Sequence, residues 1–459
     1  MSSASSKPWK PLPDDDPDDV VFSSLYGIRT IELNRPKKLN SLNSSMIRKI
    51  APRLLEWEKS DMANVVVMKG AGDKAFCAGG DVAALAEANK KGAEGQKWST
   101  DYFGLEYRLD HLIATYQKPF VAFIDGITMG GGVGLSVHAP IRIATERTVF
   151  AMPETTIGFF PDVGASFFLS RMPGAVGTYL ALTSDRLTGP NVFYAGIATH
   201  YLHSTSLPGL ESRLAELRFK DYDSLATRLD NINATIEEYS TGLPHDQPIL
   251  LAGDLRKAID RCFGLDSVAD IISELQTEVA SGRSTKEWAT KTLETLHQRS
   301  PTAVHVSLRQ MRIGRQWSLA EAFTREHRMA AQFMRHPDFT EGVTARLVEK
   351  RTPQWQPASL EDISPMEDVT APFFGTFSQT PPLELLNDRD YDEYPFRYGV
   401  PSESDIKTLV REGAKRPREI VNAMVGKTRG KQGIKEVTQE IVTRKTKTDD
   451  KGNAEWLES

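Results

Sequence analysis

Residues 121–162 read VAFIDGITMGGGVGLSVHAPIRIATERTVFAMPETTIGFFPD. The apolar run at 121–124 predicts a strand, which is followed by glycines at 130–132, by Gly134 and by a short helix that Pro140 ends. Glycines let a ligand approach main-chain N–H groups, and at a helix N-terminus these groups carry a partial positive charge. The pattern therefore predicts a loop that stabilises an oxyanion. A tight turn with close helix packing would use the same glycines.

Two acids follow this loop in apolar surroundings. Glu154 and Asp162 are the only charged residues between Arg147 and Arg171. A carboxyl group among apolar side chains loses hydration, so its pKa rises toward the range that suits general acid–base chemistry. Each acid has a structural alternative, since Asp162 could be the N-cap of a helix and Glu154 could lie in a first helical turn.

Several further motifs make the chain similar to the crotonase superfamily and, within it, to the family of 3-hydroxyisobutyryl-CoA hydrolases. The likeness covers most of the chain. Its motifs are LNRPKKLNSLN (33–43), KAFCAGGDV (74–82), EYRLDHLIATYQKPFVAFIDGITMGGGVGLSVH (106–138), FAMPETTIGFFPDVGASFFLSRMPG (150–174), YLALTSDRLTGPNVFYAGIATHYL (179–202) and HPDFTEGVTARLVEKRTPQW (336–355).

This resemblance implies a role for five residues in hydrolysis of a CoA thioester. The amides of Gly80 and Gly131 would form the oxyanion hole for the thioester carbonyl, where each donor contributes roughly 3–4 kcal/mol. Glu154 would either activate water or attack directly to give an anhydride, and both routes stay open. Asp162 would orient water or the substrate hydroxyl, and Glu106 matches a position that contacts the substrate.

The resemblance says less about which residues bind the CoA moiety and about whether a cofactor is needed. Lys37, Lys38 and Lys74 are candidates to meet the CoA phosphates, although surface lysines are common. Neither a metal nor a redox cofactor is needed for the implied reaction.

Two rival functions remain open. Enoyl-CoA hydration in this superfamily uses a second acid twenty residues before the position of Glu154, and Gly134 stands there. The missing acid disfavours hydration or isomerisation. The other rival is a ribosomal structural protein on an inactive hydrolase fold.

Composition excludes several classes of protein. At 459 residues, 40% hydrophobic and 25% charged, the chain can bury at least one large core. No apolar run approaches the roughly 20 residues that span a bilayer. Cys77 and Cys262 give neither a disulfide framework nor a metal spacing. The glycine loop does not match the dinucleotide fingerprint, because Leu135 and Val137 stand where a further glycine is required.

Strand and helix signals alternate from Val20 onward, which predicts an α/β fold. The resemblance specifies a crotonase-like ββα spiral with a C-terminal helical region and an extended basic tail. We expect five parts: a disordered acidic leader at 1–20, a catalytic core at 21–203, a helical region at 204–355, an irregular surface strap at 356–410 and a basic tail at 411–459.

The basic tail predicts an anionic partner. Residues 411–448 carry eleven Lys or Arg against four Glu, a local charge of +7 in a chain whose total is −5. Basic helical tails are often merely solvated. RGKQGI at 429–434 resembles the RGK-x-GI core of fungal hydrolase-family members that are also proteins of the small mitochondrial ribosomal subunit. That resemblance implies docking on ribosomal RNA or protein through residues 411–459.

The resemblance also implies the mitochondrial matrix. The leader, with five aspartates at 14–19, lacks the Arg-rich and acid-poor character of a transit peptide. We therefore expect the targeting signal to be atypical or to lie outside this numbering.

Overall fold

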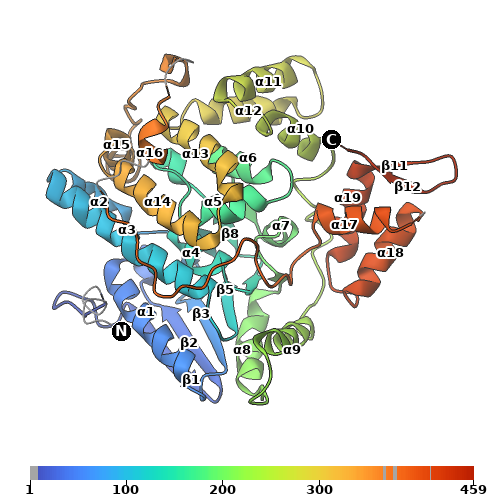
Figure 1. The fold of residues 1–459 in the computed structure, drawn as a ribbon, viewed down its shortest axis with the longest axis horizontal. Coiled ribbons are helices and arrows are strands. Elements are labelled where there is room, and N and C mark those ends of the chain that lie inside the picture. The colour runs from blue at the N-terminus through green and yellow to red at the C-terminus, as the bar shows by residue number, and fades with distance from the viewer. Residues whose placement is uncertain (1–8, 365–367, 376–379, 414, 459) are drawn as a thin grey trace.

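The computed structural model describes residues 9–364, 368–375, 380–413 and 415–458 (Figure 1). Two sheets form the centre of the α/β core. The strands of the first sheet are, in spatial order, β1 (Val20–Leu25), β2 (Ile28–Leu33), β3 (Val65–Gly70), β5 (Phe120–Ile124), β7 (Ile141–Ala144) and β10 (His200–Tyr201). Those of the second sheet are β4 (Ala75–Cys77), β6 (Ile127–Met129), β8 (Val149–Ala151) and β9 (Leu187–Thr188).

Both faces of the larger sheet are covered, and its central strands β3 and β5 carry apolar side chains on both faces. The side chains of a strand point alternately to opposite faces. In β3, Val65 and Val67 pack with Leu210 and Ile232 of two later helices, α8 (Leu207–Ala215) and α9 (Leu225–Glu237). Val66 and Met68 instead join the main core on the other side. The parallel pairing of β2, β3, β5, β7 and β10 agrees with this two-sided burial.

Helices surround this centre. The predicted helix at 44–59 is present as α1 (Ser44–Lys59), with Asn43 as its N-cap. The remaining helices of the core and helical region are α2 (Val82–Asn89), α3 (Ala93–Ala114), α4 (Gly131–Val137), α5 (Ala165–Phe168), α6 (Val176–Thr183), α7 (Pro190–Tyr194), α10 (Gly253–Phe263), α11 (Val268–Ala280), α12 (Lys286–Leu296), α13 (Pro301–Ile313), α14 (Leu319–Phe333), α15 (Pro337–Val343) and α16 (Ala371–Phe374). None of the described helices combines the length and apolar character that crossing a bilayer requires.

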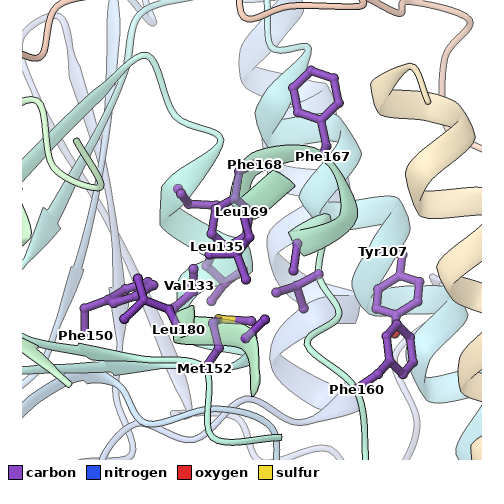
Figure 2. Close-up of a cluster of buried hydrophobic side chains, with 14 of the residues drawn as sticks. Tyr107, Val133, Leu135, Phe150, Met152, Phe160, Phe167, Phe168, Leu169 and Leu180 are labelled. Atoms are coloured by element: carbon purple, nitrogen blue, oxygen red, sulfur yellow. The ribbon is translucent and has the colours of Figure 1, made fainter. Parts of the chain in front are cut away.

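The main core gathers around α4 and the segment that follows β8. Figure 2 shows Val133 and Leu135 of α4 clustered with Met152 and Leu180, and Tyr107 of α3 beside Phe160. All of these side chains are buried. The glycine helix α4 is therefore held between α3 and the acid-bearing segment at 152–162.

The acidic leader is ordered where it is described, and this corrects the expectation of disorder for residues 9–20. Asp15 pairs with Arg48, and Asp19 pairs with Lys49 at 2.6 Å. Both cations lie on α1. These ion pairs hold the aspartates in place. Because the partners belong to a different segment, the composition of the leader alone does not reveal them. Residues 1–8 lie outside the described residues.

The C-terminal part is a folded module, and not the extended tail that the sequence suggested. It comprises α17 (Glu403–Arg411), α18 (Pro417–Lys427), α19 (Ile434–Lys445) and a hairpin of β11 (Thr446–Thr448) and β12 (Ala454–Trp456). Its helices bury Ile406, Ile420, Met424, Ile434 and Ile441 in a core of their own. These buried apolar residues explain why the segment folds. The prediction of an extended tail rested on the number of basic residues and did not take them into account. We call residues 403–456 the C-terminal module.

The RGKQGI segment attaches this module to the core. Lys431 Nζ lies 3.1 Å from Glu237 Oε1 and 2.9 Å from Nε2 of His200. Gln432 donates to the carbonyl of Tyr201, and Gly433 adopts a φ of +77° where an added Cβ would meet Phe193. The most distinctive residues of the motif therefore face the protein itself.

An irregular strap, residues 380–402, connects the helical region with the module and runs along α3 (Figure 1). Arg108 donates to the carbonyl of Glu384 at 2.7 Å, and Tyr391 donates to the carbonyl of Ala114 at 2.6 Å. Arg389 pairs with Glu58 at 2.8 Å. The strap thereby closes the outer side of α3.

Candidate active site

Three parallel strands of the smaller sheet place three predicted site residues at one edge. β4, β6 and β8 are neighbours and run in the same direction. Gly80 follows β4, Gly131 follows β6 and Glu154 follows β8. Because parallel strands end at the same edge of a sheet, these residues lie together, although more than seventy positions separate Gly80 from Glu154.

The two glycine amides face a common space. A Cβ built on Gly131 would lie 3.3 Å from the nitrogen of Gly80 and would overlap with Oε1 of Glu106. Neither amide donates a backbone hydrogen bond in the described turns and loops. Gly130 precedes Gly131 with a φ of +47°, a value that favours glycine. One unused N–H donor at the start of α4 and one in the loop after β4 have the arrangement that a developing oxyanion requires.

Helix α3 carries two buried acids against the glycines of α4. Glu106 Oε1 lies beside Gly131, and Asp110 Oδ2 lies 2.6 Å from where a Cβ of Gly134 would be. Neither Glu106 Oε1 nor either oxygen of Asp110 has a hydrogen-bond partner within the described residues. The sequence analysis missed Asp110. Its position four residues after Glu106, on the same face of a helix, was the available signal.

Glu154 begins a short 3₁₀ helix (Glu154–Ile157), so the first-turn alternative describes its backbone correctly. Its side chain is nonetheless turned toward the glycine loop, with Oε1 2.9 Å from the Cβ position of Gly130. Its other oxygen, Oε2, is buried and has no hydrogen-bond partner in the described part of the chain. The carboxyl group of Glu154 therefore lies next to the glycine loop, with one oxygen available to a bound ligand.

Asp162 is not a helix N-cap, which corrects the structural alternative. The N-cap of α5 is Gly164, and no side chain caps it. Glu326 of α14 instead accepts hydrogen bonds from the amides of Gly164 (2.6 Å) and Ser166 (2.8 Å). Asp162 is thereby free to accept a hydrogen bond from Tyr107, at 2.7 Å. Glu326 was also missed, because it lies more than 160 residues beyond the loop that it caps.

The turn after Asp162 holds a β-branched residue in an unusual conformation. Val163 has a φ of +53°, which a valine rarely adopts. Its carbonyl contacts Nε2 of His138 at 2.7 Å, and Nδ1 of His138 lies 2.6 Å from the hydroxyl of Tyr394 in the strap. His138, held between Tyr394 and the carbonyl of Val163, therefore fixes the backbone next to Asp162.

Burial raises the pKa of each of these acids. The pKa of Glu154 lies well above its usual value because of burial and then the charge of Asp162, and the same two causes raise the pKa of Glu106. Burial raises the pKa of Asp162 to about 7, against the opposing hydrogen bond from Tyr107. Burial also raises the pKa of Glu326 to about 8. The site therefore holds carboxyl groups that exchange protons near neutral pH.

The remaining candidates lie outside this cluster. Lys37, Lys38 and Lys74 are exposed, and Lys38 Nζ lies 3.4 Å from Asp81, the neighbour of Gly80. Cys77 is buried, and burial raises the pKa of its thiol to about 12. In the described ranges no group of three or more His, Cys, Asp or Glu is arranged to hold a metal ion.

Comparison with known proteins gives a consistent family. Residues 28–373 match the family model described as enoyl-CoA hydratase/isomerase. Small ribosomal subunit protein mS47 of Neurospora crassa is 58% identical over 449 residues, covering 96% of this chain and 88% of that protein. The mitochondrial 3-hydroxyisobutyryl-CoA hydrolase of Gallus gallus is 44% identical over 347 residues, covering 75% of this chain and 86% of the hydrolase. A carnitinyl-CoA dehydratase structure from Mycobacterium thermoresistibile superposes with a TM-score of 0.68 at 34% identity, covering 81% of this chain and all of that one.

Proposed function

The chain belongs to the enoyl-CoA hydratase/isomerase family, and on that basis we propose that it hydrolyses 3-hydroxyisobutyryl-CoA to 3-hydroxyisobutyrate and free CoA, a step of valine catabolism. One observation carries the proposal. Glu154 and the free amides of Gly80 and Gly131 meet at one sheet edge, while Gly134 occupies the position of the hydratases' second acid. The 44% identity to a hydrolase of that name supports the choice of substrate.

In the proposed reaction, the amides of Gly80 and Gly131 bind the thioester oxygen as it becomes negatively charged. Glu154 either removes a proton from water, which then attacks the carbonyl carbon, or attacks that carbon itself. In the second route CoA thiolate leaves first, and water then cleaves the anhydride. Both routes consume one water and release a carboxylic acid and a protonated thiol. Asp162, anchored by Tyr107, orients the water or the substrate hydroxyl.

Single-turnover hydrolysis in ¹⁸O-labelled water distinguishes the two routes. If Glu154 attacks directly and water then cleaves the glutamyl side of the anhydride, the label enters Glu154 and the first turnover releases unlabelled product. Mass spectrometry of the peptide that contains Glu154 detects this. If Glu154 acts as a base, the label appears in 3-hydroxyisobutyrate alone.

The reaction class is tested by comparing two substrates with the purified full-length protein. We expect free CoA to be released from 3-hydroxyisobutyryl-CoA faster than crotonyl-CoA is hydrated. A preference for hydration would overturn the hydrolase proposal. No turnover of either substrate would favour the rival function, a ribosomal structural protein on an inactive hydrolase fold.

We further propose that the protein is a component of the mitochondrial small ribosomal subunit, located in the matrix and docked through residues 411–459. The match to mS47 supports this, since it leaves only about 4% of the 459 residues, or about 18, uncovered. That is fewer than the module contains, so the match must extend into it. The match to the hydrolase covers 75% of this chain, so it need not include the module.

Charge on the module agrees with an RNA partner. Without residues 411–448 the chain has a charge of −5 − 7 = −12, so attraction to phosphate must come from the module. Lys431 and Arg444 are used internally, paired with Glu237 and with Glu403. The exposed cations Arg416, Arg418, Arg429 and Lys435 have no ion-pair partner within the described residues.

Docking is tested by reversing the charge of these four cations to Glu. We expect wild-type protein to co-sediment with small mitochondrial subunits in a salt-sensitive manner, and the reversed variant to remain free. Lys90→Glu with Lys97→Glu, two exposed cations at the end of α2 and on α3, is the control. Wild-type protein that never co-sediments, or a reversed variant that still does, would refute docking through these cations. The hydrolase proposal would stand in either case.

A further inference from the structure

A cavity of about 510 Å³ lies where the core, the strap and the C-terminal module meet. Arg142, Phe168 and Tyr194 line it from the core, Val400 from the end of the strap, and Ile441 and Arg444 from α19. None of the acids of the candidate active site is among its lining residues. Its size falls in the range of about 300–1,000 Å³ that is typical of small-molecule sites.

Arg142 brings a charge to this cavity without an acidic partner. Its Nε donates to the carbonyl of Ile197 and its Nη1 to that of Ala139, both at 2.6 Å. Within the described residues it forms no ion pair, and burial lowers its pKa to about 10. Arg142 is half-buried, and in the described ranges its Nη2 reaches only the carbonyl of Gly196, at 3.5 Å. A charge that loses hydration is normally paired, because removing it from water costs free energy. A ligand with negative charge would supply the missing partner.

Arg444, which lines the cavity from the C-terminal module, adds a second donor without a hydrogen-bond partner among the described residues. Only 3% of its side chain is exposed, and its Nε and Nη2 are held by Glu440 and Glu403, each at 2.8 Å. Its Nη1 has no hydrogen-bond partner in the described part of the chain, and the nearest carboxylate oxygen, of Asp260, is 3.8 Å away. An unsatisfied buried donor is rare in native proteins.

Apart from its apolar side chains, the lining holds six cations against four acids, which leaves a net positive charge: Arg142, Arg171, Arg256, Arg397, Lys427 and Arg444 against Glu393, Glu403, Asp405 and Glu440. Met172 and Val176 extend the surface of Phe168, and Leu251 and Val400 face it from elsewhere in the chain. A guanidinium group binds a carboxylate through two parallel hydrogen bonds, and apolar walls exclude a ligand that is charged throughout. The lining therefore favours an anionic head joined to an apolar body.

We propose that this cavity binds an organic carboxylate with an apolar body, and that the carboxylate pairs with Arg142. Because the walls come from both the core and the module, the bound ligand joins the two. Binding then stabilises the attachment of α19 to the core. The site does not depend on the hydrolase reaction or on ribosome docking.

Decanoate is a suitable probe for the full-length protein. We expect isothermal titration calorimetry to give a dissociation constant well below about 1 mM, and amide hydrogen exchange in α19 to slow when decanoate is bound. Arg142→Gln should weaken binding by about tenfold or more. Arg397→Gln is the matched control, since Arg397 also lines the cavity but is exposed and paired with Glu393. It should change the affinity by less than about twofold.

A second variant keeps the proposal open to refutation if Arg142→Gln fails to fold. Ala195 is half-buried and lines the cavity, so Ala195→Trp should obstruct part of it and weaken decanoate binding by about tenfold or more while thioester hydrolysis continues. The proposal is overturned if wild-type protein does not bind decanoate at about 1 mM. It is also overturned if the Ala195→Trp protein, or a folded Arg142→Gln protein, binds as tightly as wild type.

Discussion

The hydroxyl of Tyr107 lies 2.7 Å from Oδ2 of Asp162, with both side chains buried. Tyr107 directly follows Glu106 on α3, so this hydrogen bond ties Asp162 to the helix that carries Glu106. A donor to a carboxylate stabilises its charged form and lowers its pKa. The bond therefore opposes the burial that raises the pKa of Asp162 to about 7.

Replacing Tyr107 by Phe removes this donor, and the pKa of Asp162 should rise further. If Asp162 acts as a carboxylate, the acidic limb of the kcat/KM profile should move upward by about one pH unit. Tyr116→Phe is the control, because its hydroxyl donates to the carbonyl of Leu54 instead. An unchanged acidic limb in Tyr107→Phe would mean that ionisation of Asp162 does not govern the rate.

Glu154→Gln keeps the shape of the side chain and removes the base or nucleophile. We expect kcat to fall by about 10³-fold or more, whereas the dissociation constant for the CoA ester changes little. Asp162→Asn should also lower kcat strongly. Glu87→Gln, at an exposed acid of α2, should leave both quantities unchanged. Near-normal turnover in Glu154→Gln or in Asp162→Asn would remove that residue from the mechanism.

Gly131→Ala tests the proposed oxyanion hole. The new Cβ would overlap with Oε1 of Glu106 and lie 3.3 Å from the nitrogen of Gly80, so it would occupy the space of the thioester oxygen. We expect kcat/KM to fall by about 10²–10³-fold. Gly426→Ala is the control, since an added Cβ meets nothing within 4 Å there and helix α18 should gain about 0.5–1 kcal/mol. Equal activity of the two variants would argue against an oxyanion hole at Gly131.

The buried acids also predict how stability depends on pH. Between about pH 4 and pH 7 the unfolded chain has lost the proton of Asp162, whose reference pKa is 3.8, whereas the folded chain retains it. The folded state therefore binds more protons, and its free energy of unfolding should decrease as pH rises through this window, by about 4 kcal/mol in all and by about 2–3 kcal/mol between pH 5 and pH 7. Urea denaturation at pH 5 and pH 8 measures the difference. Asp162→Asn should make the dependence shallower, with the other raised acids, Glu154, Glu106 and Glu326, accounting for what remains. A wild-type stability that increased over the same interval would contradict the assignment.

Local patterns in the sequence predicted a good part of the fold. Helices α1 and α13 begin directly after Asn43 and Ser300, two N-caps that precede apolar periodicity in the sequence. Residues 207–237, within the predicted helical region, form two helices, α8 and α9, rather than one. The residues between them, ending at the N-cap Ser224, had given no strong break signal.

Long-range contacts account for what local patterns could not predict. Glu326 caps a turn that lies far from it in the sequence, and Arg48 and Lys49 order a leader whose composition resembles that of a disordered segment. The convergence of Gly80, Gly131 and Glu154 was implied by family resemblance, and its physical origin is the order of strands in the smaller sheet. Strand order depends on pairings between distant segments, which no local pattern specifies.

The strap and the module join residues from distant parts of the chain. Arg389 contacts Glu58, 331 positions earlier, and Lys431 contacts His200, 231 positions earlier. During synthesis the N-terminal residues emerge first, and contacts of such large sequence separation form slowly. A nascent chain that ends before residue 380 thus leaves the outer side of α3 uncovered. Residues 380–456 supply these contacts, so a chain that terminates before them should yield a product that chaperones retain.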